Sequence, residues 1–580
     1  MSRRPALVAA WVAIAAAVLS GCVTLPESGP VVDAGNADST AEEATSRYVP
    51  NPPEPGATAT TIVREFFEAM TATPIQTNSA QEFLTEEAQG TWAPEEQTIV
   101  YAEAAQPRAS SQTRVSVQLT DAYRLDSRGV FTGLLAQSSS TQLFRMEIEE
   151  DEWRIAQLPD ALIVPRTWTD EQFRSVDVYY FDPTARILVP EPATIPRGEQ
   201  FATAVTRSLL AGPGASLTGV SRNFLPSELT LGLSVPVDEE GVADVALQGD
   251  ASAMSPEEAA LAAVQLAWTL RQDPSIASIR LTANGQALPG LPIEVPVAEG
   301  AEYDPADLRS SSTMFALRDG QVVSGAPTSM TAVPGRAGQR DYGFTSLAVS
   351  LDATRVAGIA GNGSRVLVGP TSDPEGALQQ VVGGATSLLA PAWDAADRIW
   401  LVDRTVAGGR VSVVVDGRPQ SVDVPRITGA DVRHFLVSRD GSRLIAAVRR
   451  RRGDFLVAAR IRYDDRGLLT AVTPGQPLPW PNPELPRIRD LTWRTPTSVA
   501  VLYPIRDQAQ VRTLAVDGSP AALSIASSTL SGDFRYLIGA PDPEGDLYAA
   551  TRQGFTDLSE AADRSTAGSD VDLSTLTYSG

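Results

Sequence analysis

The chain has 580 residues, with 70 acidic and 47 basic side chains, a formal net charge of −23, one cysteine and one histidine. A surface this acidic lacks the positive footprint that nucleic acids and anionic lipid surfaces require, so we expect no nucleic-acid partner. A lone cysteine cannot form an internal disulfide, so apolar cores, spread over several domains of about 100–200 residues, must stabilise the fold.

The first 21 residues have the layout of a secretory signal peptide. Two arginines precede an apolar stretch, residues 6–19, which is shorter than the about 20 residues of a membrane-spanning helix. The tetrapeptide that ends this segment resembles a bacterial lipobox: Leu19, Ser20, Gly21 and Cys22. The resemblance implies cleavage before Cys22, a diacylglycerol on its thiol and an N-acyl group such as palmitate. Several acyl chains anchor a protein stably on a membrane. An ordinary signal peptide with an incidental cysteine is the alternative.

Residues 22–57 are rich in proline, serine, alanine and acidic residues and show no apolar period. This composition predicts an extended linker that holds the folded body away from the membrane. No later stretch approaches about 20 apolar residues, so the mature chain is expected to be exported and anchored only through Cys22.

Residues 58–170 predict a first α+β domain. Ile62, Phe66 and Met70 share one helix face, and the spacing of Ser79 and Glu82 predicts a capping box for a second short helix. Period-two patterns then predict antiparallel strands with these apolar positions: Val115, Val117, Leu119, Phe144, Met146, Ile148, Trp153 and Ile155. Helices followed by a sheet resemble the NTF2-like and cystatin-like folds.

Residues 171–300 predict a second α+β domain. A strand at 176–180 precedes a helix whose apolar face carries Phe201, Val205 and Leu209. Alternating apolar residues then predict one long strand over 229–237, which returns at 245–247. A helix follows, with Ser255 and Glu258 as a capping box. The last strand is predicted at 279–281, with a turn at 284–285.

Residues 310–575 contain a repeat. "LAVSLDATRVAGIA" (347–360) and "FLVSRDGSRLIAAV" (435–448) match in their apolar positions and in Val-Ser-x-Asp, with Asp352 and Asp440 in corresponding places. Further copies give steps of about 40–50 residues, the period of β-propeller blades. The length predicts about six blades, and a hairpin at 314–325 is predicted to close the ring with C-terminal strands.

The order of these parts carries a family resemblance. The segments "VYYFDP", "LLAGP", "ADVAL" and "LAWTLRQDPSIASIRLTANG" resemble the GerMN domain over about residues 175–290. A lipobox in front and propeller repeats behind resemble the actinobacterial LpqB lipoprotein family. The resemblance implies a location on the extracytoplasmic face of the cell membrane. It also implies a partner, the extracellular domain of an MtrB-like sensor histidine kinase, whose signalling in cell-wall homeostasis and division the family modulates.

The sequence offers no catalytic constellation, so we expect a non-enzymatic protein without cofactor or metal. The chain has no lysine, and its one cysteine is assigned to lipid, which excludes thiol and Schiff-base chemistry. His434 has no second histidine for a zinc site and no Gly-x-Ser-x-Gly elbow for a triad, so we interpret it as structural. The repeats contain no Asp-x-Asp-x-Asp-Gly run of the kind that binds calcium.

Other chemistry remains open in the sequence. With 70 carboxylates, a two-carboxylate glycan hydrolase or lyase in the propeller is one alternative, and a passive cell-wall glycan scaffold is another. The acidic clusters at 149–152 and 238–240 are interpreted as hairpin tips, and Asp352 and Asp440 are interpreted as turn formers that bond their own backbone and not as catalytic acids. Arg449–Arg452 is interpreted as a hairpin end, with an anionic glycan or acidic partner as the alternative. Five aromatic residues are interpreted as packing residues and not as a sugar platform: Tyr179, Tyr180, Trp268, Trp393 and Trp493.

Overall fold

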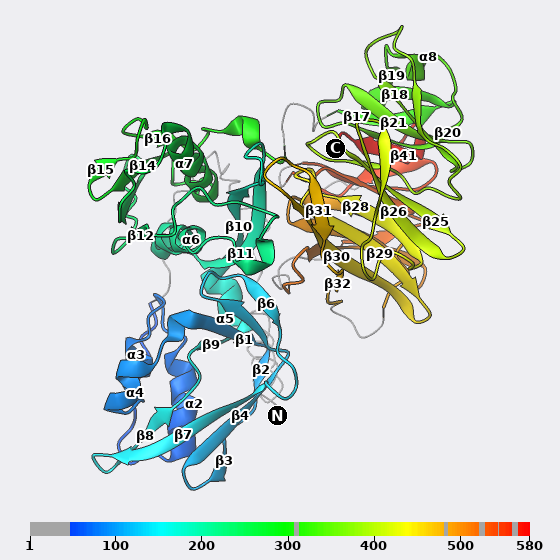
Figure 1. The fold of residues 1–580 in the computed structure, drawn as a ribbon. Helices are drawn as coiled ribbons and strands as arrows, with labels where there is room; N and C mark the ends of the chain where they lie inside the picture. Colours follow the sequence, from blue (N-terminus) through cyan, green and yellow to red (C-terminus); the bar gives the residue numbers. More distant parts are fainter. Residues whose placement is uncertain (1–46, 307–312, 481–484, 521–527, 543–544, 560–565) are drawn as a thin grey trace, which may run out of the picture. The chain divides into compact units, whose positions relative to one another are not determined.

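The computed structural model describes residues 47–306, 313–480, 485–520, 528–542, 545–559 and 566–580. The lipobox, with Cys22, and residues 22–46 of the predicted linker lie outside the described residues. Residues 48–580 form one compact unit, which contains two α+β domains and an all-β propeller (Figure 1). Within the described ranges, no helix has the length and apolar character needed to cross a membrane.

The first domain packs its longest helix against strands of two sheets. Its helices are α2 (Ala59–Ala69), α3 (Asn78–Gln81), α4 (Glu86–Thr91) and α5 (Arg166–Gln172). Its strands are β1 (Gln97–Tyr101), β2 (Glu103–Ala104), β3 (Arg108–Ser111), β4 (Arg114–Thr120), β5 (Tyr123–Asp126), β6 (Phe131–Leu134), β7 (Thr141–Glu149), β8 (Glu152–Gln157) and β9 (Leu162–Pro165). One sheet has the order β6-β5-β1-β9, and the other has the order β2-β4-β7-β8 with β3 beside β4. The predicted apolar face of α2 is buried in the core between them.

Two details of this domain differ from the sequence analysis. Ser79 lies inside α3 and does not cap it. Thr85 caps the next helix, α4, because its hydroxyl accepts a hydrogen bond from the Ala88 N–H. The helix breaks because the backbone at residues 83–85 pairs with Ile155 of β8, and this pairing competes with a continuous helix. The end of the predicted linker is also tied down, since Tyr48 and Thr73 exchange two backbone hydrogen bonds of 3.0 Å.

The second domain packs two helices against a hairpin and a mixed sheet. The hairpin consists of β10 (Phe173–Phe181) and β11 (Leu188–Pro196). The remaining elements are α6 (Phe201–Leu210), β12 (Thr230–Leu231), β13 (Val242–Gln248), α7 (Pro256–Leu270), β14 (Ser278–Ala283), β15 (Gln286–Ala287) and β16 (Val295–Pro296). The capping box of Ser255 and Glu258 is confirmed at the start of α7.

The long strand predicted over 229–237 is wrong. Thr230 and Leu231 form a two-residue strand with β13, Val237 makes an isolated bridge to Ala243, and Leu233 is 92% exposed. Pro236 has no N–H to donate to a ladder. The N–H of Val235 donates to the Thr203 hydroxyl instead of to a strand. The alternating pattern therefore predicted a longer strand than the structure contains, because most of this segment is irregular.

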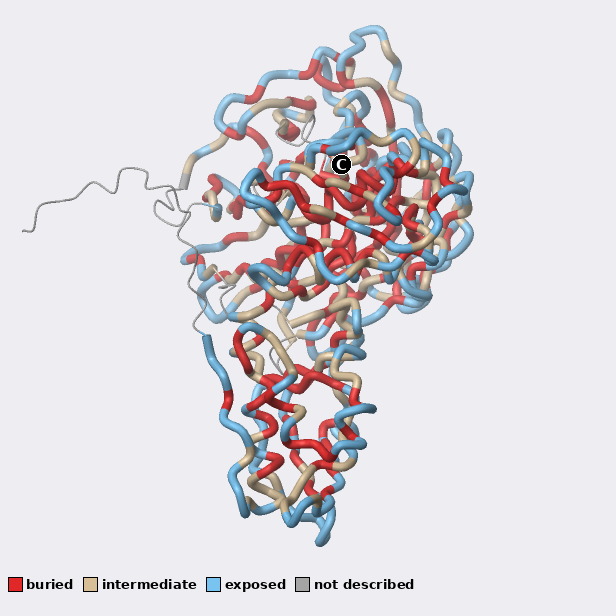
Figure 2. The backbone as a smooth tube through the Cα atoms, turned by 90° about the vertical axis from the view of Figure 1, so that its left-hand side faces the viewer, coloured by how far each residue is buried: buried red, intermediate tan, exposed pale blue. Residues whose placement is uncertain are grey.

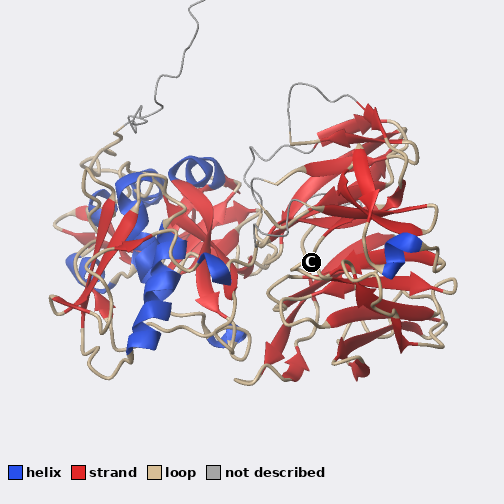
Figure 3. Ribbon diagram, turned by 90° about the horizontal axis from the view of Figure 1, so that it is seen from above, coloured by secondary structure: helices blue, strands red, loops and turns tan. Residues whose placement is uncertain are grey.

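The propeller contains six antiparallel sheets within the described residues (Figure 3). Their strands are β17 (Met314–Arg318), β18 (Gln321–Ala326), β19 (Ser329–Ala332), β20 (Phe344–Val349), β21 (Arg355–Ala360), β22 (Arg365–Pro370), β23 (Gln379–Val382), β24 (Ala392–Trp393), β25 (Ile399–Thr405), β26 (Gly408–Val415), β27 (Arg418–Val422), β28 (Val432–Val437), β29 (Arg443–Arg450), β30 (Gly453–Tyr463), β31 (Leu469–Val472), β32 (Gln476–Pro477), β33 (Asp490–Thr495), β34 (Ser498–Ile505), β35 (Gln508–Ala515), β36 (Ser528–Ser531), β37 (Tyr536–Gly539), β38 (Leu547–Ala550), β39 (Gly554–Asp557), β40 (Thr566–Gly568) and β41 (Asp572–Tyr578). One short helix, α8 (Arg336–Gln339), follows β19.

The ring closes through β41, which pairs with β17 in the sheet β19-β18-β17-β41. This confirms the predicted pairing of the 314–325 hairpin with a C-terminal strand. Buried residues concentrate along the strands of each blade, where neighbouring sheets pack on one another (Figure 2). The innermost strands of the six sheets are β20, β24, β28, β33, β37 and β41.

Candidate functional site

One glutamate joins the second domain to the propeller. Glu191 lies in β11, whose other residues from 188 to 193 are apolar and buried, and only 5% of Glu191 is exposed. Its carboxylate receives two hydrogen bonds from Arg460, of 2.7 and 2.6 Å, and lies 2.9 Å from Nη2 of Arg443. Arg443 also donates to the carbonyl of Pro190. We call this group of Glu191, Arg443 and Arg460 the clasp.

The clasp compensates a repulsion inside the propeller. Arg443 of β29 and Arg460 of β30 are directly opposite in the antiparallel register, and only 1% of the Arg443 side chain is exposed. Like charges opposite one another on paired strands are destabilising, and a buried charge needs a partner. The Glu191 carboxylate, which belongs to the second domain, forms ion pairs with both arginines and so compensates their positive charges. Arg443 also lies 3.8 Å from Asp440 of its own blade, so the electrostatic balance of this blade depends in part on the second domain.

Two further contacts reinforce this junction. The Thr497 hydroxyl of the propeller donates to Oδ1 of Asp177 in β10 (2.8 Å), and the Tyr463 N–H donates to the Gly219 carbonyl (2.7 Å). Burial between the domains raises the pKa of Asp177 to about 6, against the hydrogen bond from Thr497, which lowers it.

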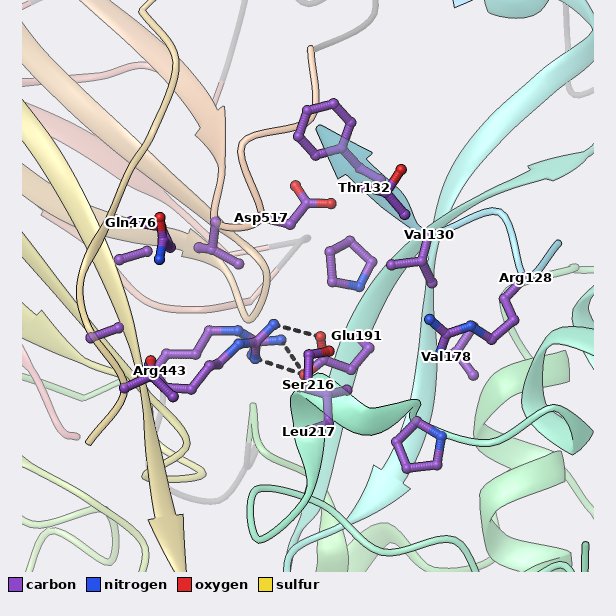
Figure 4. A pocket seen from close by; sticks show the side chains of 18 of the residues that line it. Arg128, Val130, Thr132, Val178, Glu191, Ser216, Leu217, Arg443, Gln476 and Asp517 are labelled. Carbon is purple, nitrogen blue, oxygen red and sulfur yellow. Dashed lines mark hydrogen bonds and ion pairs between the residues drawn. The ribbon is translucent and has the colours of Figure 1, made fainter. Parts of the chain in front are cut away.

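A cavity of about 500 Å³ adjoins the clasp, and side chains of all three domains line it (Figure 4). Val130 and Thr132 come from the first domain, and Val178 comes from the second. The propeller contributes Gln476 and Asp517 beside the clasp arginines. In Figure 4, Arg443 points toward Glu191.

The carboxylates beside this cavity are engaged by other groups of the protein. Both oxygens of Glu191 are taken by guanidinium groups. Asp517 accepts hydrogen bonds from Ser519, and burial raises its pKa. Across the described ranges, no cluster of three or more His, Cys, Asp or Glu side chains could hold a metal ion.

The repeated Val-Ser-x-Asp turns are structural. Asp352 accepts hydrogen bonds from the Ser350 hydroxyl (2.6 Å) and the Thr354 N–H (3.1 Å). Asp440 repeats this pattern with Ser438 (2.7 Å) and Ser442 (2.6 Å). The prediction that these aspartates form turns is confirmed.

The remaining sequence candidates are also placed. Asp454 is buried and paired with Arg449 (two bonds of 2.9 Å) and Arg487 (3.1 Å), so the arginine run ends a strand at a hairpin. Glu150 and Asp151 form a hairpin tip with positive φ, and Asp238 closes its own turn. Four of the five aromatic residues are buried, and Tyr179 packs against the core of the second domain. His434 lies 3.3 Å from Asp490 in the propeller.

The clasp residues were missed by the sequence analysis. A signal existed, because an arginine follows the turn aspartate by three residues in both clear repeats, as Arg355 and Arg443. Arg355 lies over the Trp393 ring, at 5.1 Å from its centroid, whereas Arg443 reaches another domain. The isolated glutamate in the apolar run "LVPEPATIP" was the second signal. Neither indicates its partner, because the two lie about 250 residues apart.

Three family models match the chain. "Lipoprotein LpqB, N-terminal domain" matches residues 52–170, and "Lipoprotein LpqB beta-propeller domain" matches residues 320–564. "Sporulation and spore germination", the Germane model, matches residues 177–289. The three matches follow one another along nearly all of the described chain.

Relatives with the same arrangement are found in several actinobacteria. Lipoprotein LpqB of Thermobifida fusca is 27% identical, over 91% of this chain and 92% of the relative. The Rhodococcus jostii protein of that name is 28% identical, over 96% of this chain and 98% of the relative. The Mycobacterium tuberculosis protein is 28% identical, over 74% of this chain and 76% of the relative.

Solved structures resemble the chain only at a low level. A chain of a nidogen/laminin complex aligns with a TM-score of 0.34 and 14% identity, over 46% of this chain and 98% of that one. TolB from Acinetobacter baumannii aligns with a TM-score of 0.30 and 10% identity, over 47% and 67%. Similarity at this level does not bear on function. The three consecutive family matches, together with the relatives that align over most of their length, show that this chain belongs to the LpqB lipoprotein family.

Proposed function

We propose that this protein is a membrane-anchored lipoprotein on the extracytoplasmic face that acts without catalysis as an accessory to a two-component system. In this proposal it binds the extracellular domain of an MtrB-like sensor histidine kinase and modulates signalling in cell-wall homeostasis and division. The anchor is Cys22, within the lipobox of Leu19, Ser20, Gly21 and Cys22. The resemblance to the LpqB family motivates the partner.

The observation that supports this proposal best is the clasp. A protein that binds another through two of its domains needs those domains in a fixed arrangement, because disorder between them adds an entropic cost to association. Glu191, held by both Arg443 and Arg460, fixes the GerMN domain against the propeller. The two domains can then present one composite surface.

The alternative partner is cell-wall glycan. A glycan-binding protein commonly stacks sugar rings on exposed aromatic faces, but Trp268, Trp393 and Trp493 are buried in domain cores. We therefore favour a protein partner over glycan, and we treat glycan binding or hydrolysis as an outcome that the experiment must distinguish.

The test is calorimetric titration of residues 48–580 with the purified extracellular domain of the kinase, alongside incubation with purified cell wall. Saturable binding to the kinase domain that survives moderate salt is expected, with no fragments released from the wall. No binding between two folded proteins would contradict the proposal. Wall binding or released glycan would instead support a scaffold or a hydrolase.

A further inference from the structure

The central channel of the propeller contains a polar pocket of about 210 Å³. Among the described residues, the ionisable side chains that line it are Arg433, His434 and Asp490. An engineered cavity of about 150 Å³ in another protein holds a benzene molecule, so this channel has room for a ligand of roughly ten non-hydrogen atoms.

One end of the channel is closed. The buried Arg439 follows β28 and donates to the carbonyls of Ser579 (2.6 Å) and Ala306. The N–H of Gly580 donates to the carbonyl of Val349 at the end of β20 (2.8 Å). Beside Arg439, the space that Pro305 and Trp493 also line holds no water-sized volume. His434 and Asp490 lie toward the opposite ends of β28 and β33, so the pocket is blind behind them.

The imidazole of His434 lies beside a carboxylate that is itself held by two backbone amides. Nδ1 of His434 lies 3.3 Å from Oδ1 of Asp490. Asp490 also accepts hydrogen bonds from the N–H groups of Leu491 (2.9 Å) and Leu537 (2.8 Å). A histidine that uses Nδ1 toward a carboxylate presents Nε2 to a ligand.

A local irregularity accompanies these side chains. The register of β28 against β29 shifts between Val432 and His434, so the strand is bulged at Arg433. Bulges re-aim side chains and are common beside functional sites. Arg433 and His434 are adjacent in sequence, yet both line the channel.

The hydrogen-bonding capacity of the lining defines the ligand. Asp490 already accepts from two amides and lies beside the histidine. Nη2 of Arg433 pairs with Asp431 at 2.9 Å, whereas its buried Nε has no hydrogen-bond partner in the part of the chain that the structure describes, so Nε of Arg433 and Nε2 of His434 are the donors available to an oxyanion. The hydroxyls of Thr492 and Thr577 donate to the carbonyls of Gly539 and Tyr578, so their oxygens remain free to accept. The lining thus offers the nitrogen donors of Arg433 and His434 together with hydroxyl acceptors.

We propose that the propeller channel is a binding site for a small hydroxylated organic anion, with Arg433 and His434 contacting its carboxylate or phosphate. Thr492 and Thr577 accept hydrogen bonds from its hydroxyl groups. This site is separate from the clasp and adds a small-molecule input to a protein whose proposed role is to bind another protein.

The sole histidine makes the test specific, because the imidazole signals of His434 in a histidine-labelled sample of residues 48–580 need no assignment. We would titrate this sample with glycerate and with glycerol 3-phosphate, with glycerol as the neutral match and sodium chloride at equal ionic strength as the salt control. Saturable shifts with either anion, and none with glycerol, are expected. Saturation by glycerate alone identifies a carboxylate site, and saturation by glycerol 3-phosphate alone identifies a phosphate site.

Arg433→Gln leaves the histidine reporter in place and should weaken the affinity for the anion about tenfold, as loss of a charge-assisted hydrogen bond predicts. Arg410→Gln, at an exposed position of β26 outside the channel lining, should leave the affinity unchanged. Shifts no larger than those with sodium chloride, equal shifts with glycerol, or an unchanged affinity in folded Arg433→Gln would each overturn the proposal.

Discussion

Replacing Glu191 by Gln is the sharpest test of the clasp. The change keeps the size of the side chain and removes its charge, which leaves Arg443 and Arg460 directly opposite one another, with the longer 3.8 Å pair between Arg443 and Asp440 remaining. Breaking a buried ion pair by removing one partner costs about 3–5 kcal/mol. Arg443 is almost fully buried, whereas 22% of the Arg460 side chain is exposed, so solvent relieves part of the penalty at Arg460. We expect a loss of about 3 kcal/mol in the stability of the junction.

The control is Glu294→Gln in the same domain. Glu294 pairs with Arg280 at 2.8 Å, with 45% and 37% of the two side chains exposed, and exposed pairs contribute about 0–1 kcal/mol. Since a multidomain chain need not unfold in one step, the measurement is native-state hydrogen exchange at the amides of β11, β29 and β30. Faster exchange in Glu191→Gln alone supports the clasp. Equal protection in the two variants would refute the electrostatic reasoning.

Three other predictions concern single residues. The pKa of Asp177 is raised to about 6, so between about pH 4 and 6 the folded state keeps a proton that the unfolded state releases. The contribution of Asp177 to the free energy of unfolding therefore falls as the pH rises through this range. Asp177→Asn should flatten that slope in urea-unfolding midpoints, and an unchanged slope would contradict it. Asp454→Ala should lower local stability by about 1–3 kcal/mol, because the Arg449 and Arg487 side chains that lose their partner are 32% and 47% exposed, while the exposed Arg451→Ala should change it by less than about 0.5 kcal/mol; native-state hydrogen exchange at the amides of β29 and β30 measures both. Cys22→Ala should release the mature protein from membranes or leave an unprocessed precursor on fractionation; normal processing with retained membrane association would refute the anchor.

Local patterns predicted the elements that local forces determine. The capping box at Ser255 and the turns at Asp352 and Asp440 were readable because their hydrogen bonds join residues two or three positions apart. The repeat period predicted a propeller, since each blade repeats the same apolar alternation.

The failures and omissions arise where distant parts of the chain compete or meet. Strand pairing with Ile155 overrides the helical pattern around Phe83, and Pro236 ends an alternation that otherwise indicates a strand. The clasp and the pairing of His434 with Asp490 join residues whose proximity depends on domain packing and on the closed ring. The sequence shows these side chains but not their partners.

The most direct measurement of the central claim is the affinity of the kinase extracellular domain for residues 48–580, compared between the original sequence, Glu191→Gln and Glu294→Gln. Calorimetry should show saturable binding by the original protein and by Glu294→Gln, with an affinity about tenfold or more lower for Glu191→Gln, since loosening the junction adds an ordering cost to association. Equal affinities in all three folded proteins would contradict a composite surface held by the clasp. No binding by the original protein would contradict the kinase partnership itself.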